Sequence, residues 1–224
     1  MFLRLLKRRF HLVWWSLFHP DNLFSFLPAN LSEQIAWEAV QTSIQQYTSF
    51  CVLGCVYGSM PFSNGLFMSC KIYFGCDVNI VAVVVARLVH FLRSPGYLYQ
   101  FTWSLAQNSF SSPAQLFVSC ATLIYFTQNE LEAFIVGLKS NPNFECFILH
   151  EMFSSDLLMP SPTVLNLYNH VHSVPLILQL FGDNYHYSFK RTFYSPWESN
   201  LDIISGLLVV SRRQSSPRPG IYQE

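Results

Sequence analysis

The sequence predicts a single compact α+β domain with a cysteine-rich loop module and an N-terminal amphipathic helix. Three observations support this fold class. At 224 residues, the chain is long enough for one sizeable hydrophobic core. Helical and strand-like apolar patterns follow one another along it. Between residues 51 and 76, Gly, Pro and Asn interrupt any regular helix, so short strands and turns are expected there.

The composition is apolar and electrically balanced. Apolar residues make up 51% of the chain, charged residues 12%, and the formal net charge is zero. A neutral chain has no electrostatic bias toward nucleic acid, so direct nucleic-acid binding is not expected. Its aromatic content of 17% favours surfaces that contact protein partners.

Residues 1–20 form the first predicted unit, a basic amphipathic helix. It carries a basic cluster and a tryptophan pair, namely Arg4, Lys7, Arg8, Arg9, Trp14 and Trp15. A signal peptide would have a longer apolar run and a cleavage site with small residues. The segment 2–18 therefore favours docking in a partner groove or on a membrane surface. Without a signal peptide, the six cysteines are expected to be reduced.

Residues 21–158 form the predicted main domain. A helix is expected to begin near Asn30, because Glu33 three residues later resembles a capping box. The run 78–92 is predicted as a buried helix, although its valines leave a strand as the alternative. A strand is predicted over 115–126 and a helix over 129–138. The segments 97–106 and 144–153 are interpreted as strands, the former with a short helix as the alternative.

The remaining chain is assigned to the same domain. A hinge is predicted at 159–162, followed by a helix and strand part over 163–210 and a disordered tail over 211–224. The helical pattern up to residue 181 contains Pro175, where a kink is expected. Neither 78–92 nor 163–181 is a clean membrane span, because the first is too short and both contain polar side chains.

The clustered cysteines predict a zinc site. Two pairs stand in the loop module, Cys51 with Cys55 and Cys70 with Cys76. Zinc is commonly held by two close thiolate pairs that a turn brings together. The alternative is that these are small buried residues, since free cysteine is among the most buried residue types.

The sequence offers no complete catalytic constellation. His170 and His172, with His150, could bind a metal, but histidines that are solvated or that cap the core explain them equally well. No nucleophile elbow, glycine-rich phosphate loop or kinase signature is present. The chain is therefore not expected to be an enzyme.

Two short patterns match the spacing of a cullin-adaptor box. In such a box, a leucine is followed four positions later by cysteine or another small residue on one helix face. Leu66 with Cys70 fits this spacing, and Leu123 with Leu131 fits a similar pattern that lacks the cysteine. Apolar pairs at helical spacing are also ordinary core residues.

Taken in order, these features resemble the adenovirus early-region-four thirty-four-kilodalton proteins. The resemblance covers residues 31–158 and is carried by the order of short motifs, which are Leu31-Ser32-Glu33, Cys51 and Cys55, Gly65 to Cys70, Phe101-Thr102-Trp103, Pro113, Leu116 to Cys120, and Leu123-Ile124-Tyr125. The arginine-rich amphipathic helix near the C-terminus of that family has no counterpart in this chain.

The resemblance implies a viral early regulatory protein that acts as a substrate adaptor. Such proteins recruit elongins and a cullin to form a ubiquitin ligase, and pair with a second viral early protein to degrade host targets. It also implies a location in the host nucleus and cytoplasm. The alternative is a small membrane-associated accessory protein anchored by the N-terminal helix.

Overall fold

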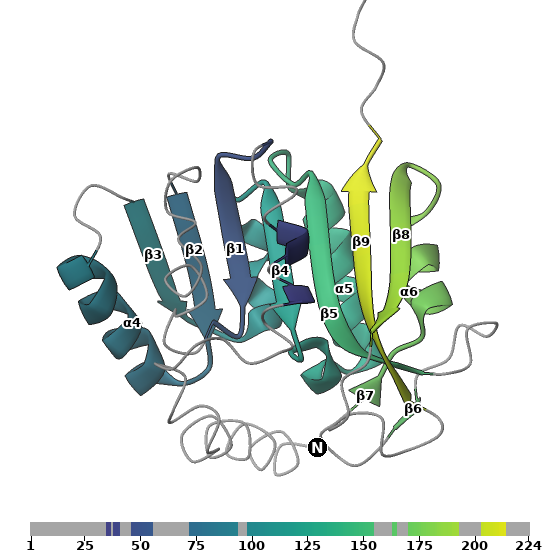
Figure 1. Cartoon of the computed structure of the whole chain (residues 1–224), viewed down its shortest axis with the longest axis horizontal. Coiled ribbons are helices and arrows are strands. Elements are labelled where there is room, and N and C mark those ends of the chain that lie inside the picture. The colour runs from purple at the N-terminus through teal and green to yellow at the C-terminus, as the bar shows by residue number, and fades with distance from the viewer. Residues whose placement is uncertain are drawn as a thin grey trace, which may run out of the picture.

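The computed structural model describes residues 35–36, 38–40, 46–55, 72–93, 98–154, 163–164, 170–192 and 203–213. A seven-stranded sheet with the order β3-β2-β1-β4-β5-β9-β8 runs through this part of the chain (Figure 1). Five neighbouring strands are parallel, namely β1 (Ser49–Leu53), β2 (Ile72–Asp77), β3 (Leu98–Trp103), β4 (Leu116–Cys120) and β5 (Cys146–Ser154). At the other end, β9 (Ile203–Arg212) runs antiparallel to β5, and β8 (Tyr185–Thr192) antiparallel to β9.

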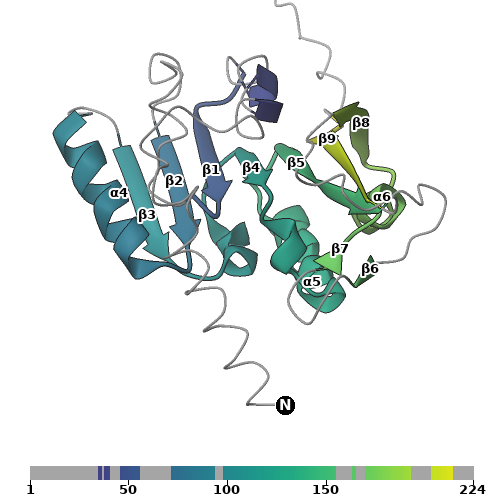
Figure 2. The same ribbon diagram turned by 60° about the horizontal axis from the view of Figure 1, so that its bottom comes forward.

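Helices cover both faces of this sheet. One face packs against α4 (Ile80–Arg93), and the other packs against α5 (Gln128–Ser140) and α6 (Val174–Phe181) (Figure 2). The connections contain two 3-10 helices, η2 (Ala106–Ser111) and η3 (Leu123–Tyr125), and a short pair of strands, β6 (Thr163–Val164) and β7 (His170–Val171). Covering both faces explains why the central strands are apolar on both sides.

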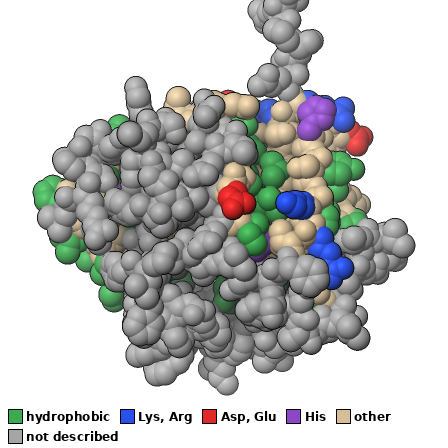
Figure 3. All heavy atoms as spheres, viewed as in Figure 1, with side chains coloured by type: hydrophobic (Ala, Val, Ile, Leu, Met, Phe, Trp, Pro, Cys, Tyr) green, Lys and Arg blue, Asp and Glu red, His purple; other side chains and the backbone are tan. Residues whose placement is uncertain are grey.

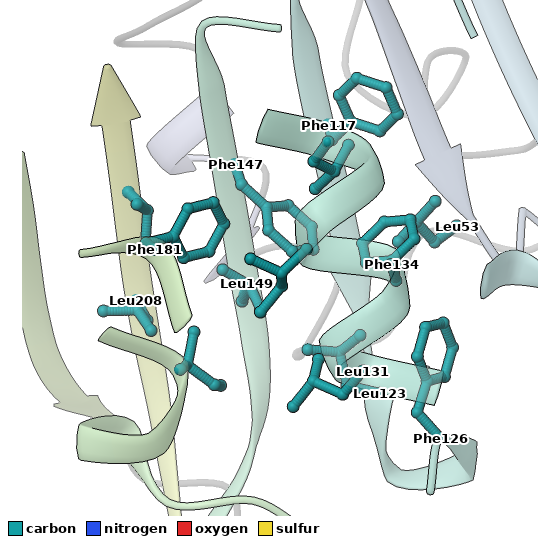
Figure 4. Close-up of a cluster of buried hydrophobic side chains, with 14 of the residues drawn as sticks. Leu53, Phe117, Leu123, Phe126, Leu131, Phe134, Phe147, Leu149, Phe181 and Leu208 are labelled. Atoms are coloured by element: carbon teal, nitrogen blue, oxygen red, sulfur yellow. The ribbon is translucent and has the colours of Figure 1, made fainter. Parts of the chain in front are cut away.

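The larger core lies between the sheet and α5 and α6. Figure 4 shows Leu53, Phe117 and Phe147 from three strands meeting Phe134 of α5. These side chains are at most 1% exposed, and several of the phenylalanine rings meet edge to face. Many of the phenylalanines in the described residues are therefore core residues, whereas the aromatic content was expected to mark partner surfaces.

The start of α5 is held by a capping box. Thr127 Oγ1 accepts a hydrogen bond from Glu130 N, and the Glu130 carboxylate accepts one from Thr127 N. Replacing Thr127 by Ala is expected to lower the free energy of unfolding by about 1 kcal/mol. Urea unfolding measures this loss. Ser140→Ala at the exposed end of the same helix is the control, and an equal loss in both variants would contradict the capping role.

Several predicted elements are confirmed. The run 78–92 is helical, as α4, the helix at 129–138 is present as α5, and the strands expected over 97–106 and 144–153 are present as β3 and β5. The strand predicted over 115–126 is correct only in its first part, because β4 ends at Cys120 and Leu123–Tyr125 is a 3-10 helix. Pro175 does not kink a longer helix. It occupies the first turn of α6, where its missing N–H has no intrahelical acceptor to lose.

The predicted fold class is wrong. The segment 51–76 was expected to be a cysteine-rich loop module in an α+β domain, but residues 49–53 and 72–77 are neighbouring parallel strands inside the seven-stranded sheet. Their short apolar runs resemble loop segments because parallel strands buried on both faces lack the alternation that marks a half-exposed strand.

Other expectations lie outside the described residues. These include the helix over 1–20, Leu66, Cys70, the hinge at 159–162 and most of the tail. The domain boundaries at 20, 158 and 210 stay predictions. Among the helices that the structure describes, none has the length and apolar character needed to span a bilayer.

Candidate functional site at the carboxyl edge of the sheet

The strand order places a topological switch point between β1 and β4, and the region beyond the carboxyl ends of these two strands is here called the crevice. From β1 the chain continues to β2 and β3 on one side, and then returns to form β4 on the other side of β1 (Figure 1). In open sheets of parallel strands, ligands bind beyond the carboxyl ends of the strands at such a switch point. The carboxyl edge of the sheet beside β1 and β4 is therefore the candidate functional site.

Four residues stand at the same level along this edge. Leu53 pairs with Cys76 on one side and with Ser119 on the other, while Cys120 pairs with His150. One residue further on, the edge therefore carries, in the order of the strands, Asp77, Gly54, Cys120 and His150. An acidic side chain and a glycine thus lie on the β1 side of the switch point.

Gly54 directly follows β1 and has a left-handed backbone conformation, which favours glycine. Its φ is +64°, and a Cβ atom on it would lie 2.6 Å from Thr122 Oγ1. The Thr122 hydroxyl is 3.1 Å from the carbonyl oxygens of both Leu53 and Cys120, to either of which it can donate. Thr122 therefore ties the ends of β1 and β4 together across the crevice.

Asp77 ends β2 and organises the start of α4. Its Oδ1 accepts a hydrogen bond from Asn79 N at 2.8 Å, and its carbonyl accepts one from Ser104 N. Asn79 in turn caps α4, because its Oδ1 accepts from the amides of Val81 and Ala82. Because the oxygen of the Asn79 side-chain amide accepts both bonds, its nitrogen Nδ2 points elsewhere. Nδ2 is buried and has no hydrogen-bond acceptor among the described residues.

The turn after β4 is held by a buried carboxyl group on β5. Glu151 Oε1 accepts hydrogen bonds from Ser119 Oγ at 2.5 Å, Thr122 N at 3.0 Å and Leu123 N at 3.2 Å. Ala121 within this turn has a φ of +51°, which is uncommon for a residue with a Cβ atom. Burial raises the pKa of Glu151 to about 7, against the lowering effect of these three donors.

The histidines do not converge on a metal. His150 Nε2 lies 2.9 Å from Thr192 Oγ1 on one face of the sheet, whereas His172 Nε2 lies 3.0 Å from the carbonyl of Phe126 on the other. Burial lowers the pKa of both rings to about 4. The histidine metal site considered from the sequence is therefore not assembled.

The cysteines are core residues in the described part of the chain. Cys51 and Cys76 are hydrogen-bonded neighbours in the core beneath α5, while Cys55 packs on the opposite face of the sheet. The hydrogen bond to Cys76 and burial raise the pKa of Cys51, and burial raises that of Cys55. Within the described ranges, no three His, Cys, Asp or Glu residues form a group that could hold a metal.

The adaptor residues within the described ranges are buried. Leu123 on η3 is 2% exposed, and Leu131 on α5 is fully buried in the main core. A side chain that is packed in the core presents no surface to an elongin. Their helical spacing reflects core packing, which was the alternative interpretation of this pattern.

Sequence reasoning missed Gly54, Asp77, Thr122 and Glu151. One signal could have found the first two, since an apolar run ends in Gly54 and an acidic residue ends the next strand 23 residues later. A glycine after one strand and an acid about 20 residues on is the spacing of nucleotide-binding βαβ units. The cysteines nearby directed the interpretation toward zinc instead.

Comparison with solved structures identifies the fold. The chain superposes on magnesium protoporphyrin IX methyltransferase from Synechocystis PCC 6803 with bound SAH (S-adenosylhomocysteine), with a TM-score of 0.60, 15% identity, and coverage of 92% of this chain and 99% of that one. The methyltransferase domain of bacterial CtHen1 gives 0.55 at 15% identity, over 81% and 100%. The [4+2]-cyclase SpnF gives 0.59 at 10% identity, over 80% and 81%. No family model matches the sequence, and no relative was found among curated proteins.

These neighbours overturn the functional expectations drawn from the sequence. The resemblance to adenovirus proteins is wrong, and with it the viral ubiquitin-ligase adaptor, its elongin and cullin partners and the second viral protein, because the sheet is that of methyltransferase structures. The membrane-associated alternative and the zinc cofactor are likewise contradicted, as is the expectation of a protein that is not an enzyme. The nuclear and cytoplasmic location stays a prediction that nothing in the structure tests. The fold of this chain is therefore that of S-adenosylmethionine-dependent methyltransferases.

Proposed function

We propose that the protein binds S-adenosylmethionine at the carboxyl edge of its sheet and transfers the methyl group to a small molecule. The observation that carries this proposal is the position of Asp77, a carboxylate at the end of β2 beside the β1–β4 switch point. A carboxylate at this place in a nucleotide-binding sheet accepts hydrogen bonds from ribose hydroxyls. S-adenosylmethionine would supply an electrophilic methyl group, and it leaves as SAH after transfer.

The residues around Asp77 fit an adenosine group. Asn79 Nδ2 is a buried donor that lacks an acceptor among the described residues, and buried polar groups are rarely left unpaired. The exposed indole of Trp103 is fixed at the same edge, because its Nε1 donates to the Val78 carbonyl at 2.9 Å. A carboxylate, an amide donor and an aromatic ring thus stand at neighbouring positions on the edge.

The glycine pattern after β1 is reduced. In dinucleotide-binding turns, glycine recurs two residues after the first one, so that the backbone can approach a pyrophosphate. This chain has Val56 at that position, and glycine returns only at Gly58. S-adenosylmethionine has no pyrophosphate, so this departure argues against a dinucleotide more than against the proposed cofactor.

The charge of the protein favours a small acceptor over a nucleic acid. Nucleic-acid binding depends on groups of Lys and Arg that neutralise phosphates. The formal net charge of this chain is zero. On the face seen in Figure 3, the described side chains over β8 and β9 mix basic, acidic, histidine and apolar groups rather than forming a basic stripe. The methyl acceptor is therefore proposed to be a small molecule.

Binding of SAH to the purified full chain tests the first half of the proposal. At 100 times the dissociation constant, a ligand that binds only the folded state adds about 2.7 kcal/mol. For a chain of this size, that corresponds to a rise in Tm of about 5–10 °C. NAD and ATP at the same concentration are the controls. No rise with SAH, or an equal rise with all three compounds, would contradict the proposal.

Methyl transfer needs a separate measurement. The chain would be incubated with S-adenosylmethionine carrying a labelled methyl group and a small-molecule extract, and label in new products would be followed by mass spectrometry. The cyclase SpnF shares the fold, so binding alone does not establish transfer. SAH binding without any labelled product would retain the cofactor site and contradict the transferase step.

A further inference from the structure

Glu151 is a buried carboxyl group, and it accepts hydrogen bonds from β4 and from the turn that follows β4. One oxygen accepts three hydrogen bonds, from the Ser119 hydroxyl and from the amides of Thr122 and Leu123. The other oxygen, Oε2, is buried and has no hydrogen-bond donor among the described residues. The group therefore works as a single acceptor that gathers three donors from β4 and η3.

The turn that Glu151 holds contains a backbone conformation that is uncommon for a residue with a Cβ atom. Ala121 adopts a φ of +51°, and its amide donates to the His150 carbonyl at 3.1 Å. The next two amides are those that Glu151 accepts. A non-glycine residue in this region persists when its surroundings over-determine it. Here the surroundings are the β5 backbone on one side and the Glu151 carboxyl on the other.

Through Thr122, this turn reaches the β1–β4 crevice. The Thr122 hydroxyl lies at hydrogen-bonding distance from the Leu53 carbonyl, and its side chain occupies the space beside Gly54. A shift of the turn would therefore move Thr122 relative to the end of β1. The carboxyl on β5 and the glycine on β1 are linked in this way, although neither touches the other.

The groups around Glu151 give it no cationic partner in the described structure. Tyr125 on η3 is near enough for the carboxyl to raise its pKa further, after burial, to about 12. His172, which directly follows β7, is directed to the Phe126 carbonyl, and burial lowers its pKa to about 4, so it is neutral near pH 7. Arg191 of β8 is level with Glu151, but the strand β9 separates them, while His150 points to the opposite face.

From these contacts, we infer that Glu151 is a positioning residue of the cofactor site, which holds the 121–123 turn so that Thr122 sets the shape of the crevice beside Gly54. This inference rests on the proposed function, since the crevice is taken as the S-adenosylmethionine site. The three donors that Glu151 Oε1 accepts belong to β4 and to this turn, so the carboxyl acts through the turn.

Two substitutions separate hydrogen bonding from packing. Glu151→Gln keeps an acceptor oxygen at the same place, and its affinity for SAH is expected to stay within about threefold of the wild-type value. Glu151→Leu leaves the Thr122 and Leu123 amides without an acceptor, and is expected to weaken SAH binding about 10- to 100-fold. Exchange of these two amides, followed by NMR, is expected to be about tenfold faster in Glu151→Leu.

The control is Glu130→Leu, which removes a carboxylate that also accepts a backbone amide, at the start of α5. It is expected to lower Tm without changing SAH affinity. If Glu151→Leu fails to fold, Ser119→Ala removes one donor to the carboxyl without opening the core. This milder variant is expected to weaken SAH binding about threefold and to speed exchange of the Thr122 amide.

A pH profile gives a readout that packing alone would not change. The folded pKa of Glu151, about 7, lies above its ordinary value of 4.5. The folded state therefore favours the protonated carboxyl. This preference stabilises the fold fully below pH 4.5, and the stabilisation is lost as the pH rises through about 7. The Tm of the wild type is expected to fall relative to that of Glu151→Gln between about pH 5 and 8.

The outcomes separate this inference from the proposed function. If Glu151→Leu and Ser119→Ala bind SAH as tightly as the wild type and exchange their turn amides at the same rate, the positioning role is overturned. Equal damage from Glu151→Gln and Glu151→Leu would also overturn it, because the shared oxygen would then not matter. If the wild type does not bind SAH, the proposed function fails, and amide exchange in Glu151→Leu still decides whether the carboxyl holds the turn.

Discussion

Replacing Asp77 by Asn is expected to weaken SAH binding by about 10- to 100-fold while leaving the fold intact. A hydrogen bond that involves a charged group contributes about 1.5–3 kcal/mol, which corresponds to this factor. Asn can keep the side-chain oxygen that accepts from the Asn79 amide, so the start of α4 is retained. Its second atom becomes a donor, which cannot accept a ribose hydroxyl. Titration calorimetry with SAH measures the loss.

The matched control for this substitution is Asp183→Asn. Asp183 is an exposed acid between α6 and β8, at the amino-end edge of the sheet, and its replacement makes the same change of charge. It is expected to bind SAH as the wild type does. Equal affinities in the wild type and in Asp77→Asn would show that the carboxylate at the end of β2 does not hold the ligand.

Local patterns were sufficient to predict several elements of this fold. The apolar spacing of 129–138, with Glu130 in the first turn, gave α5 nearly to its ends, because amphipathic periodicity and capping act over a few residues. The run 78–92 was helical despite its valines, since it covers one face of the sheet and begins at the Asn79 cap. These features require no knowledge of distant partners.

The strand order could not be read in the same way. β1 pairs with β2 on one side and with β4, more than 60 residues further along the chain, on the other. Such pairings depend on long-range contacts that leave no local pattern. Cys51 and Cys76 illustrate the consequence: their clustering suggested zinc, but they adjoin because β1 and β2 pair and both strands are buried.

The candidate site was hidden for a related reason. Glu151 is an isolated acid in an apolar strand, and its partners Ser119 and Thr122 lie about 30 residues earlier in the chain. Leu123, which follows Thr122, was interpreted as one position of an adaptor pattern. Only the pairing of β4 with β5 places these residues together, so their roles followed from the structure rather than from any motif.

Replacing Gly54 by Val is expected to cost about 3–4 kcal/mol of folding free energy and to abolish SAH binding. Two effects contribute. A residue with a Cβ atom at a φ of +64° costs about 1–2 kcal/mol, and more when it is β-branched. The remainder comes from overlap, since the Cβ position lies 2.6 Å from Thr122 Oγ1. Urea unfolding and SAH titration measure the two losses.

A double-mutant cycle separates these two effects. Thr122→Ala removes the atoms that the new Cβ would meet, so Gly54→Ala combined with Thr122→Ala is expected to be less destabilised than the two single variants predict by addition. The cost of the backbone conformation is the same in both backgrounds and cancels. Simple additivity would mean that Gly54 is required only for its φ. A coupling of about 1 kcal/mol or more would show that glycine is needed because Thr122 packs against it, the same contact through which Glu151 is inferred to act.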